Sequence, residues 1–114
     1  MSGSGGARDD GAVGAGTVKS EGDPCNRIWR GPINSPKAAV LASMSVGSVL
    51  GVEVKMPGSS PILTVTDCSG ADAGSLTFVG YLAIIDCIQN RGVSYKATII
   101  NISGGIHEVR VEPQ

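Results

Sequence analysis

The chain has 114 residues, of which 41% are hydrophobic and 17% are charged. This length suits one domain and the apolar content suffices for a core, so we expect neither a multi-domain enzyme nor a chain that is disordered throughout. Nine Lys and Arg residues against ten Asp and Glu residues give a formal net charge of −1. Such a chain lacks the strongly basic surface typical of proteins that bind nucleic acids without sequence preference.

Residues 1–23 are rich in glycine and, after Met1, contain no apolar residue larger than valine. Burial of such small side chains cannot offset the entropy lost on ordering, so we predict a disordered, glycine-rich tail. The segment has no basic stretch followed by an apolar run, and no window of the chain approaches the ~20 apolar residues of a membrane span. We therefore expect a cytoplasmic protein that does not associate with membranes.

Three prolines exclude a regular helix or a central strand from residues 24–37, which we interpret as an arm that leads into a domain at residues 38–114. The arm contains the only tryptophan, Trp29, with Arg27 and Arg30 on either side. One interpretation is a stacking surface for a nucleic-acid base with phosphate-binding neighbours. The other is an anchor that fixes the arm onto the domain.

The pattern is typical of β-structure after the arm. Residues 37–42 (KAAVLA) predict a short first strand. Residues 49–56 alternate between apolar and polar side chains, which is typical of a half-buried strand, and residues 62–67 resume the alternation after a Pro-Gly-Ser-Ser-Pro break. Residues 69–74 are rich in Ser, Gly and Asp and predict a turn.

Helical periodicity occurs once, where apolar side chains recur at intervals of three and four residues between Phe78 and Ile88. We expect Thr77 to be the N-cap. Arg91 and Gly92 should end the helix, because a cation favours the C-terminus and glycine accepts the left-handed conformation. The sequence therefore predicts one helix of about three turns, packed by its apolar side on a sheet.

Two strands are expected after this helix, at residues 93–101 and 106–111, joined by a Ser-Gly-Gly hairpin turn. The fold class is therefore mainly β (α+β). We predict a small curled sheet or β-barrel of five to six strands, with one helix before the C-terminal hairpin. That helix should close one open end of the barrel.

The cysteines are three in number and include no CxxC pair: Cys25, Cys68 and Cys87. This pattern indicates neither a disulfide framework nor a zinc ribbon, so we expect reduced thiols. Together with His107 they would make a formal Cys₃His zinc set, but the separations of 43, 19 and 20 residues are unlike the close pairs of structural zinc sites. We expect no metal and no cofactor.

His107 is the only histidine, and it is either a general base or a side chain at the edge of a strand. The chain contains no GxSxG elbow and no Walker loop. An enzymatic mechanism would require Cys68 and His107 to come within hydrogen-bond reach of each other. We expect no catalytic residues and no enzyme.

The order of strands, glycines and helix resembles the HIRAN family of small β-barrel domains. The resemblance covers about residues 37–112 and rests on the stretches at 46–50, 61–67, 74–76 and 91–97. HIRAN-like domains recognise DNA ends, so the resemblance implies binding of single-stranded nucleic acid or DNA ends. The candidate binding residues are Trp29, Arg27, Arg30, Tyr95, Lys96 and Arg91.

Our first hypothesis is a non-enzymatic interaction module that binds a protein partner, because aromatic and arginine side chains are typical interface anchors. The alternative is the HIRAN-like nucleic-acid binder, whose affinity should fall steeply with salt and whose Arg27, Arg30 and Lys96 should share one side of the domain. We further consider that residues 49–56 form an exposed edge strand through which the protein forms a homodimer.

Overall fold

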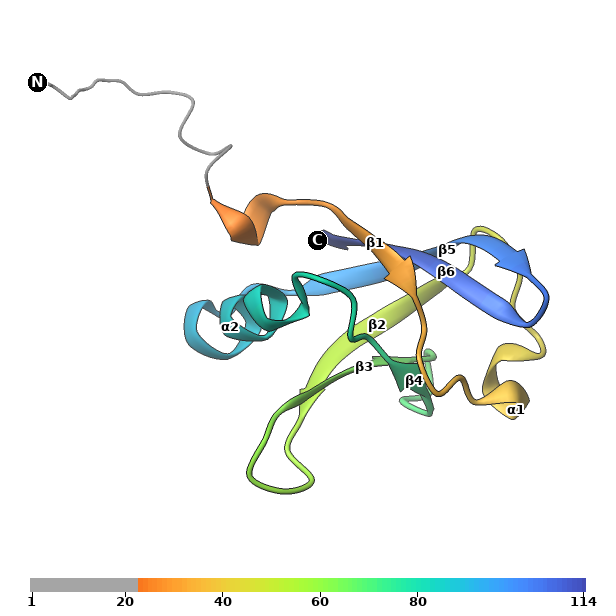
Figure 1. The fold of residues 1–114 in the computed structure, drawn as a ribbon, viewed down its shortest axis with the longest axis horizontal. Coiled ribbons are helices and arrows are strands. Elements are labelled where there is room, and N and C mark those ends of the chain that lie inside the picture. The colour runs from red at the N-terminus through yellow and green to blue at the C-terminus, as the bar shows by residue number, and fades with distance from the viewer. Residues whose placement is uncertain (1–22) are drawn as a thin grey trace, which may run out of the picture.

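A computed structural model describes residues 23–114; of the tail predicted at residues 1–23, all but Asp23 lies outside the described residues. A short 3₁₀ helix, η2 (Pro24–Asn26), is followed by two helices and six strands (Figure 1). In chain order these are β1 (Trp29–Pro32), α1 (Ala38–Leu41), β2 (Val49–Lys55), β3 (Ile62–Thr66), β4 (Asp72–Ser75), α2 (Tyr81–Arg91), β5 (Tyr95–Ser103) and β6 (Ile106–Pro113). The strands form one antiparallel sheet in the order β1-β6-β5-β2-β3-β4. The predicted fold class is confirmed.

The two halves of the curled sheet meet at one residue of β2. The first residues of β2, from Val49 to Gly51, pair with β5, whereas Gly51 to Lys55 pair with β3. Gly51 belongs to both ladders, and a Cβ at this position would lie 3.0 Å from the hydroxyl of Thr66. The curl brings the two edges together, where an isolated bridge joins Asn34, after β1, to Ser75 in β4.

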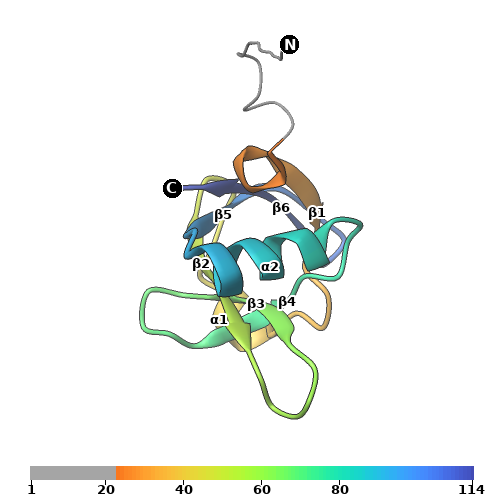
Figure 2. The same cartoon turned by 90° about the vertical axis from the view of Figure 1, so that its left-hand side faces the viewer.

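Helix α2 lies across the opening between the β1-β6-β5 half and the β2-β3-β4 half of the sheet (Figure 2). Its Ile84 and Ile85 are buried against inward-facing strand residues such as Leu63, Ile99 and Val109. α1 and the turn between β5 and β6 lie at the opposite end of the sheet (Figure 1). Burial of these apolar side chains is the main favourable term in folding.

The structure confirms the later predicted elements. The stretches at 49–56, 62–67, 93–101 and 106–111 correspond to β2, β3, β5 and β6. Helix α2 ends at Arg91, and Gly92 follows in the left-handed conformation with φ of 66°. The hairpin turn uses positive φ at both of its glycines, as the Ser-Gly-Gly pattern predicts.

Three local predictions are wrong. Residues 37–42 contain helix α1 and not a strand, because a short apolar run fits both periods and the alanines favour a helix. The turn predicted at 69–74 contains the start of β4, whose Gly74 pairs with Val65 at a position where a side chain has no room. α2 begins at Tyr81 and not after Thr77, because Gly80 takes a left-handed conformation and is the N-cap.

The interpretation of residues 49–56 as an edge strand is also wrong, because β2 lies between β5 and β3. The edge strands of the sheet are β1 and β4. β1 lies within the arm at residues 24–37, and its edge position agrees with the exclusion of a central strand by the prolines. Homodimerisation through an edge strand stays a prediction.

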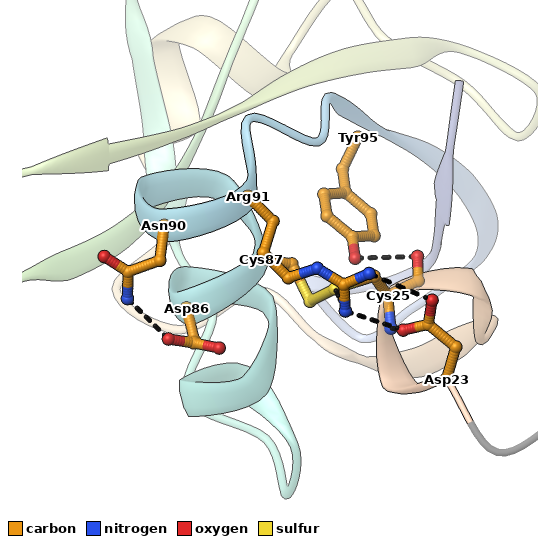
Figure 3. Close-up of a disulfide and its surroundings, with 7 residues drawn as sticks. All are labelled: Asp23, Cys25, Asp86, Cys87, Asn90, Arg91 and Tyr95. Carbon is orange, nitrogen blue, oxygen red and sulfur yellow. Dashed lines mark hydrogen bonds and ion pairs between the residues drawn. A yellow bond between two sulfur atoms is a disulfide. The ribbon is translucent and has the colours of Figure 1, made fainter.

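The expectation of reduced thiols is wrong for two of the cysteines, because Cys25 and Cys87 form a disulfide (Figure 3). Their Cα atoms are 5.6 Å apart, although 62 positions separate them in the sequence. Both are buried and join η2 to α2, whereas Cys68 is free and exposed. The disulfide therefore links the arm covalently to the helix that closes the curled sheet.

We predict that the double variant Cys25→Ala/Cys87→Ala loses about 2–4 kcal/mol of unfolding free energy, because the disulfide closes a long loop in the unfolded chain. Urea unfolding followed by circular dichroism measures the change, with Cys68→Ser as the control that should leave the midpoint unchanged. An unchanged midpoint in the double variant would contradict a stabilising disulfide.

Candidate functional site

Two of the predicted binding residues, Arg91 and Tyr95, hold the arm in place (Figure 3). Nη1 and Nη2 of Arg91 donate to the two carboxylate oxygens of Asp23 at 2.9 and 3.2 Å. The hydroxyl of Tyr95 donates to the carbonyl oxygen of Cys25 at 2.9 Å, and the Tyr95 residue is only 1% exposed. The ring of Tyr95 is therefore inaccessible for stacking on a base.

The same contacts shift the ionisation of these groups. The hydrogen bond from Arg91 holds the pKa of Asp23 below its usual 3.8, with a further contribution from the backbone N–H of Cys25. The Asp23 carboxylate in turn raises the pKa of Arg91. Burial raises the pKa of Tyr95. Asp23 and Arg91 therefore form a charged pair at neutral pH.

The stabilising effect of this pair should disappear in acid. Because the pKa of Asp23 is lower in the folded state, its contribution is fully present above the unfolded value near 3.8 and is lost as the pH falls through the folded pKa. We predict that Asp23→Asn lowers the thermal midpoint at pH 7 and that the difference from the unmodified protein shrinks towards pH 2. The pKa of Asp23 is measured by an NMR titration of its carboxyl carbon. A value of 3.8 or higher would contradict the ion pair with Arg91 as the origin of the difference in stability.

Trp29 lies against α2 as an anchor of the arm. A Cβ on Gly80 would be only 2.0 Å from Cζ3 of Trp29, so the indole ring occupies the space that a side chain would need. The guanidinium of Arg27 is 5.8 Å from the centre of the indole ring, within the range of a cation–π contact. Half-buried between these groups, Trp29 packs against the core and so agrees with the anchor interpretation.

Arg30 and Lys96 are placed together on the outer side of the sheet. Arg30 in β1 is directly opposite Arg110 in β6, and Lys96 in β5 is opposite Glu112 in β6. Arg27, by contrast, lies over Trp29. We call Arg30, Arg110 and Lys96 the basic outer strip, which Glu112 adjoins. The six predicted residues therefore divide between this strip and the attachment of the arm, and they form no common site.

A groove between α1 and the β5-β6 hairpin is the best candidate for a binding site that the sequence did not reveal. Its volume is about 410 Å³, in the range of ligand-binding clefts. Most of its lining is apolar: Pro36, Ala38, Leu41, Ala42, Met44, Ile102, Gly105 and His107. We call this feature the hairpin groove.

The walls of the hairpin groove include exposed apolar side chains. Ile102 is 38% exposed on the hairpin side, and Pro36, Ala38 and Ala42 are exposed on the α1 side. Nδ1 of His107 is buried and has no hydrogen-bond partner among the described residues. The groove thus offers a mainly apolar surface, which suits an apolar ligand.

Sequence reasoning missed the hairpin groove for a physical reason. Leu41 belongs to the segment that the sequence predicts as a strand, so its position in helix α1 was not expected. Ile102 and His107 are opposite each other in the β5-β6 ladder, but only the tertiary fold brings α1 against that hairpin. The available signal was the pair of isoleucines beside a polar Ser-Gly-Gly turn, where solvent exposure is expected.

The four residues of the formal Cys₃His zinc set have different places in the structure. Cys68 is free and exposed, and His107 lines the hairpin groove. Cys25 and Cys87 are bonded to each other, and no group of three or more His, Cys, Asp and Glu residues in this range could hold a metal ion. The helices of this range are also too short or too polar to cross a membrane.

The chain matches no known protein-family model, no curated protein and no solved structure.

Proposed function

We propose that the protein is a non-enzymatic binding module whose hairpin groove receives a short apolar segment of a protein partner. The observation that carries the proposal is the apolar hollow of about 410 Å³ with the exposed side chain of Ile102 in its wall. Covering such side chains stabilises a complex by roughly 25 cal/mol per Å² of apolar surface. The partner segment would place an apolar side chain in the groove.

A peptide occupant fits better than a small molecule for two reasons. Exposed apolar residues line both walls of the groove, with Ile102 on the hairpin and Ala38 and Ala42 on the α1 side, and an extended peptide covers both walls. The half-buried ring of His107 adds a polar group to one wall, and a peptide has backbone amides that pair with such a group. Main-chain polar groups with apolar anchors are the usual chemistry of peptide recognition.

The test uses a phage-displayed library of random dodecapeptides selected on the unmodified protein. We expect the selected peptides to carry apolar anchors and to bind about tenfold more weakly to Ile102→Asp, because the charge is placed in the apolar contact. Val49→Asp is the matched control, since Val49 is 57% exposed in β2 and lies outside the groove. Thermal melts establish that both variants fold.

If Ile102→Asp and Val49→Asp weaken peptide binding equally, or if Ile102→Asp has no effect on it, the groove is not the binding site. Failure to select any peptide with an apolar anchor would contradict the proposed ligand. Fluorescence anisotropy with labelled synthetic peptides gives the dissociation constants.

The second candidate is the HIRAN-like nucleic-acid binder, which the basic outer strip favours. Arg30 is exposed and directly opposite Arg110, and two like charges in this position repel each other. Arg110 has a carboxylate neighbour, with Glu112 at 3.6 Å, but no ion pair involves Arg30 within residues 23–114. A phosphate at Arg30 would offset the repulsion.

Titration of fluorescein-labelled single-stranded and blunt duplex DNA separates this candidate from the first. If DNA is the ligand, Arg30→Ala/Lys96→Ala should weaken binding by about tenfold and reduce the salt dependence. Thermal melts establish that the double variant folds. Absence of binding at low salt, or unchanged affinity and salt dependence in the double variant, would contradict recognition by the strip.

We also infer an oxidising environment for the protein. The sequence predicts a cytoplasmic location from the absence of a secretory pattern and of a membrane-length apolar run, and it also predicts reduced thiols, whereas Cys25 and Cys87 are bonded. Disulfides persist in oxidising compartments and are rare in the cytosol, where thiols are kept reduced. Thiol labelling of the protein isolated from its source, with and without prior reduction, tests this inference by counting the accessible cysteines.

A further inference from the structure

The geometry points to a second binding site, for a small organic acid, in a hollow on the outer side of β2, β3 and β4. The hollow has a volume of about 300 Å³ and is lined in part by Lys37, Lys55, Asp72 and Ile62. We call it the lysine pocket. It lies next to the hairpin groove along the chain, because Pro36 lines the groove and Lys37 lines the pocket. Its ligand is independent of the partner proposed for the groove.

Backbone hydrogen bonds hold the walls of the lysine pocket in place. Asn34 and Ser75 exchange two hydrogen bonds, at 2.7 and 2.8 Å, and the N–H of Lys37 donates to the carbonyl oxygen of Ala73 at 3.0 Å. Gly74 lies between them with a φ of 141°, and a Cβ there would be 2.4 Å from the side chain of Ile33. The segment that carries Lys37 is therefore fixed against β4, so the site is formed in advance of binding.

Ser35 in this wall has an unfavourable backbone conformation. Its φ is 50°, and among residues 23–114 it is the one residue other than glycine with a positive φ. It also precedes Pro36, and a residue before proline normally takes an extended conformation. Such strain is found most often at ligand-binding and active sites, where the surrounding contacts maintain it. Here it turns the chain between Asn34 and Lys37 at the edge of the pocket.

The charges of the lysine pocket favour an anion. Lys37 and Lys55 approach it from α1 and β2, and neither forms an ion pair within the described part of the chain. The one carboxylate in the lining, Asp72, is oriented by the N–H of Gly74, which donates to Oδ1 at 2.8 Å. Two ammonium groups against one carboxylate leave a single excess positive charge. A ligand with one carboxylate or phosphate group would compensate it.

The apolar part of the lining indicates what the anionic group is attached to. Ile62 is 39% exposed, and Pro57 lines the same hollow. A flat or branched apolar body of a few carbon atoms would cover these side chains while its anionic group lies between the lysines. Pockets of this size commonly combine an apolar wall with a few polar groups that orient the ligand. Benzoate and phenyl phosphate are suitable probes, because they share the ring and differ in the anionic group.

The experiment follows backbone amide shifts in ¹⁵N–¹H spectra as benzoate, phenyl phosphate, benzamide or inorganic phosphate is added. We expect saturable shifts at Gly74 and Ser75 with benzoate or phenyl phosphate, and about tenfold weaker binding of neutral benzamide and of inorganic phosphate, which lack the charge and the apolar body respectively. The tighter of the two aromatic anions identifies carboxylate or phosphate as the preferred group.

Variants locate the site. Lys55→Met and Lys37→Met retain the length of the side chains without their charge, and each should weaken binding of the aromatic anion by about tenfold. Lys96→Met is the control on the outer side of β5 and should leave binding unchanged. Binding of benzamide as tight as that of benzoate, shifts that do not saturate, or equal loss in Lys96→Met would overturn the proposal. Peptide binding in the hairpin groove should be the same in all three variants.

Discussion

The offset pairing of β2 is the constraint on which the other features of the domain depend. β2 pairs with β5 through its first residues and with β3 through its last residues, so only Gly51 is paired on both sides and few hydrogen bonds resist the curl between the two halves of the sheet. The missing side chain of Gly51 leaves room there for the hydroxyl of Thr66. The resulting curl creates an inner side that α2 covers and brings residues after β1 within hydrogen-bond distance of β4. That contact, between Asn34 and Ser75, forms the end of the domain where both hollows lie.

The arm and α2 show how residue types associated with binding can serve structure instead. Trp29, Arg91 and Tyr95 are the kinds of side chain that interfaces use, yet each makes an intramolecular contact between the arm and the rest of the domain. A charged pair and a phenol that donates to a backbone carbonyl lie beside the disulfide of Cys25 and Cys87 (Figure 3). Farther along the arm, an aromatic ring packs against a glycine. Several different interactions thus hold one short segment, which on its own would bury too little apolar surface to stay ordered.

The proposed binding surfaces are on either side of the segment from Ile33 to Lys37. One is apolar and extends over an exposed hairpin, which suits a peptide; the other is small and positively charged, which suits an organic anion. Because the backbone of this segment is fixed to β4 and β6, neither site requires a rearrangement before its ligand binds. Preformed sites lose less conformational entropy on binding than mobile ones do.

The sequence by itself determined the class of fold, the central and C-terminal strands and the C-terminal end of α2. These elements follow from alternation of apolar residues, from glycine at positive φ and from helical periodicity, all of which act between neighbours in the chain. It did not determine α1, because four apolar residues fit a helix and a strand equally well. Nor did it reveal β4. Gly74 is typical of a turn, and its role in a strand follows from the close approach of Ile33 and Asn34, which are distant in the sequence.

Only the tertiary structure decided the disulfide, the roles of Trp29 and Tyr95, and both binding surfaces. In each case the partners are far apart in the sequence, as Cys25 and Cys87 are with a separation of 62. Local patterns carry no information about such pairs, since they are set by the curl of the sheet and by the way the arm returns to α2. The physical reason is that propensity and periodicity act over one or two turns of chain, whereas a binding site depends on which distant segments the packed core brings together.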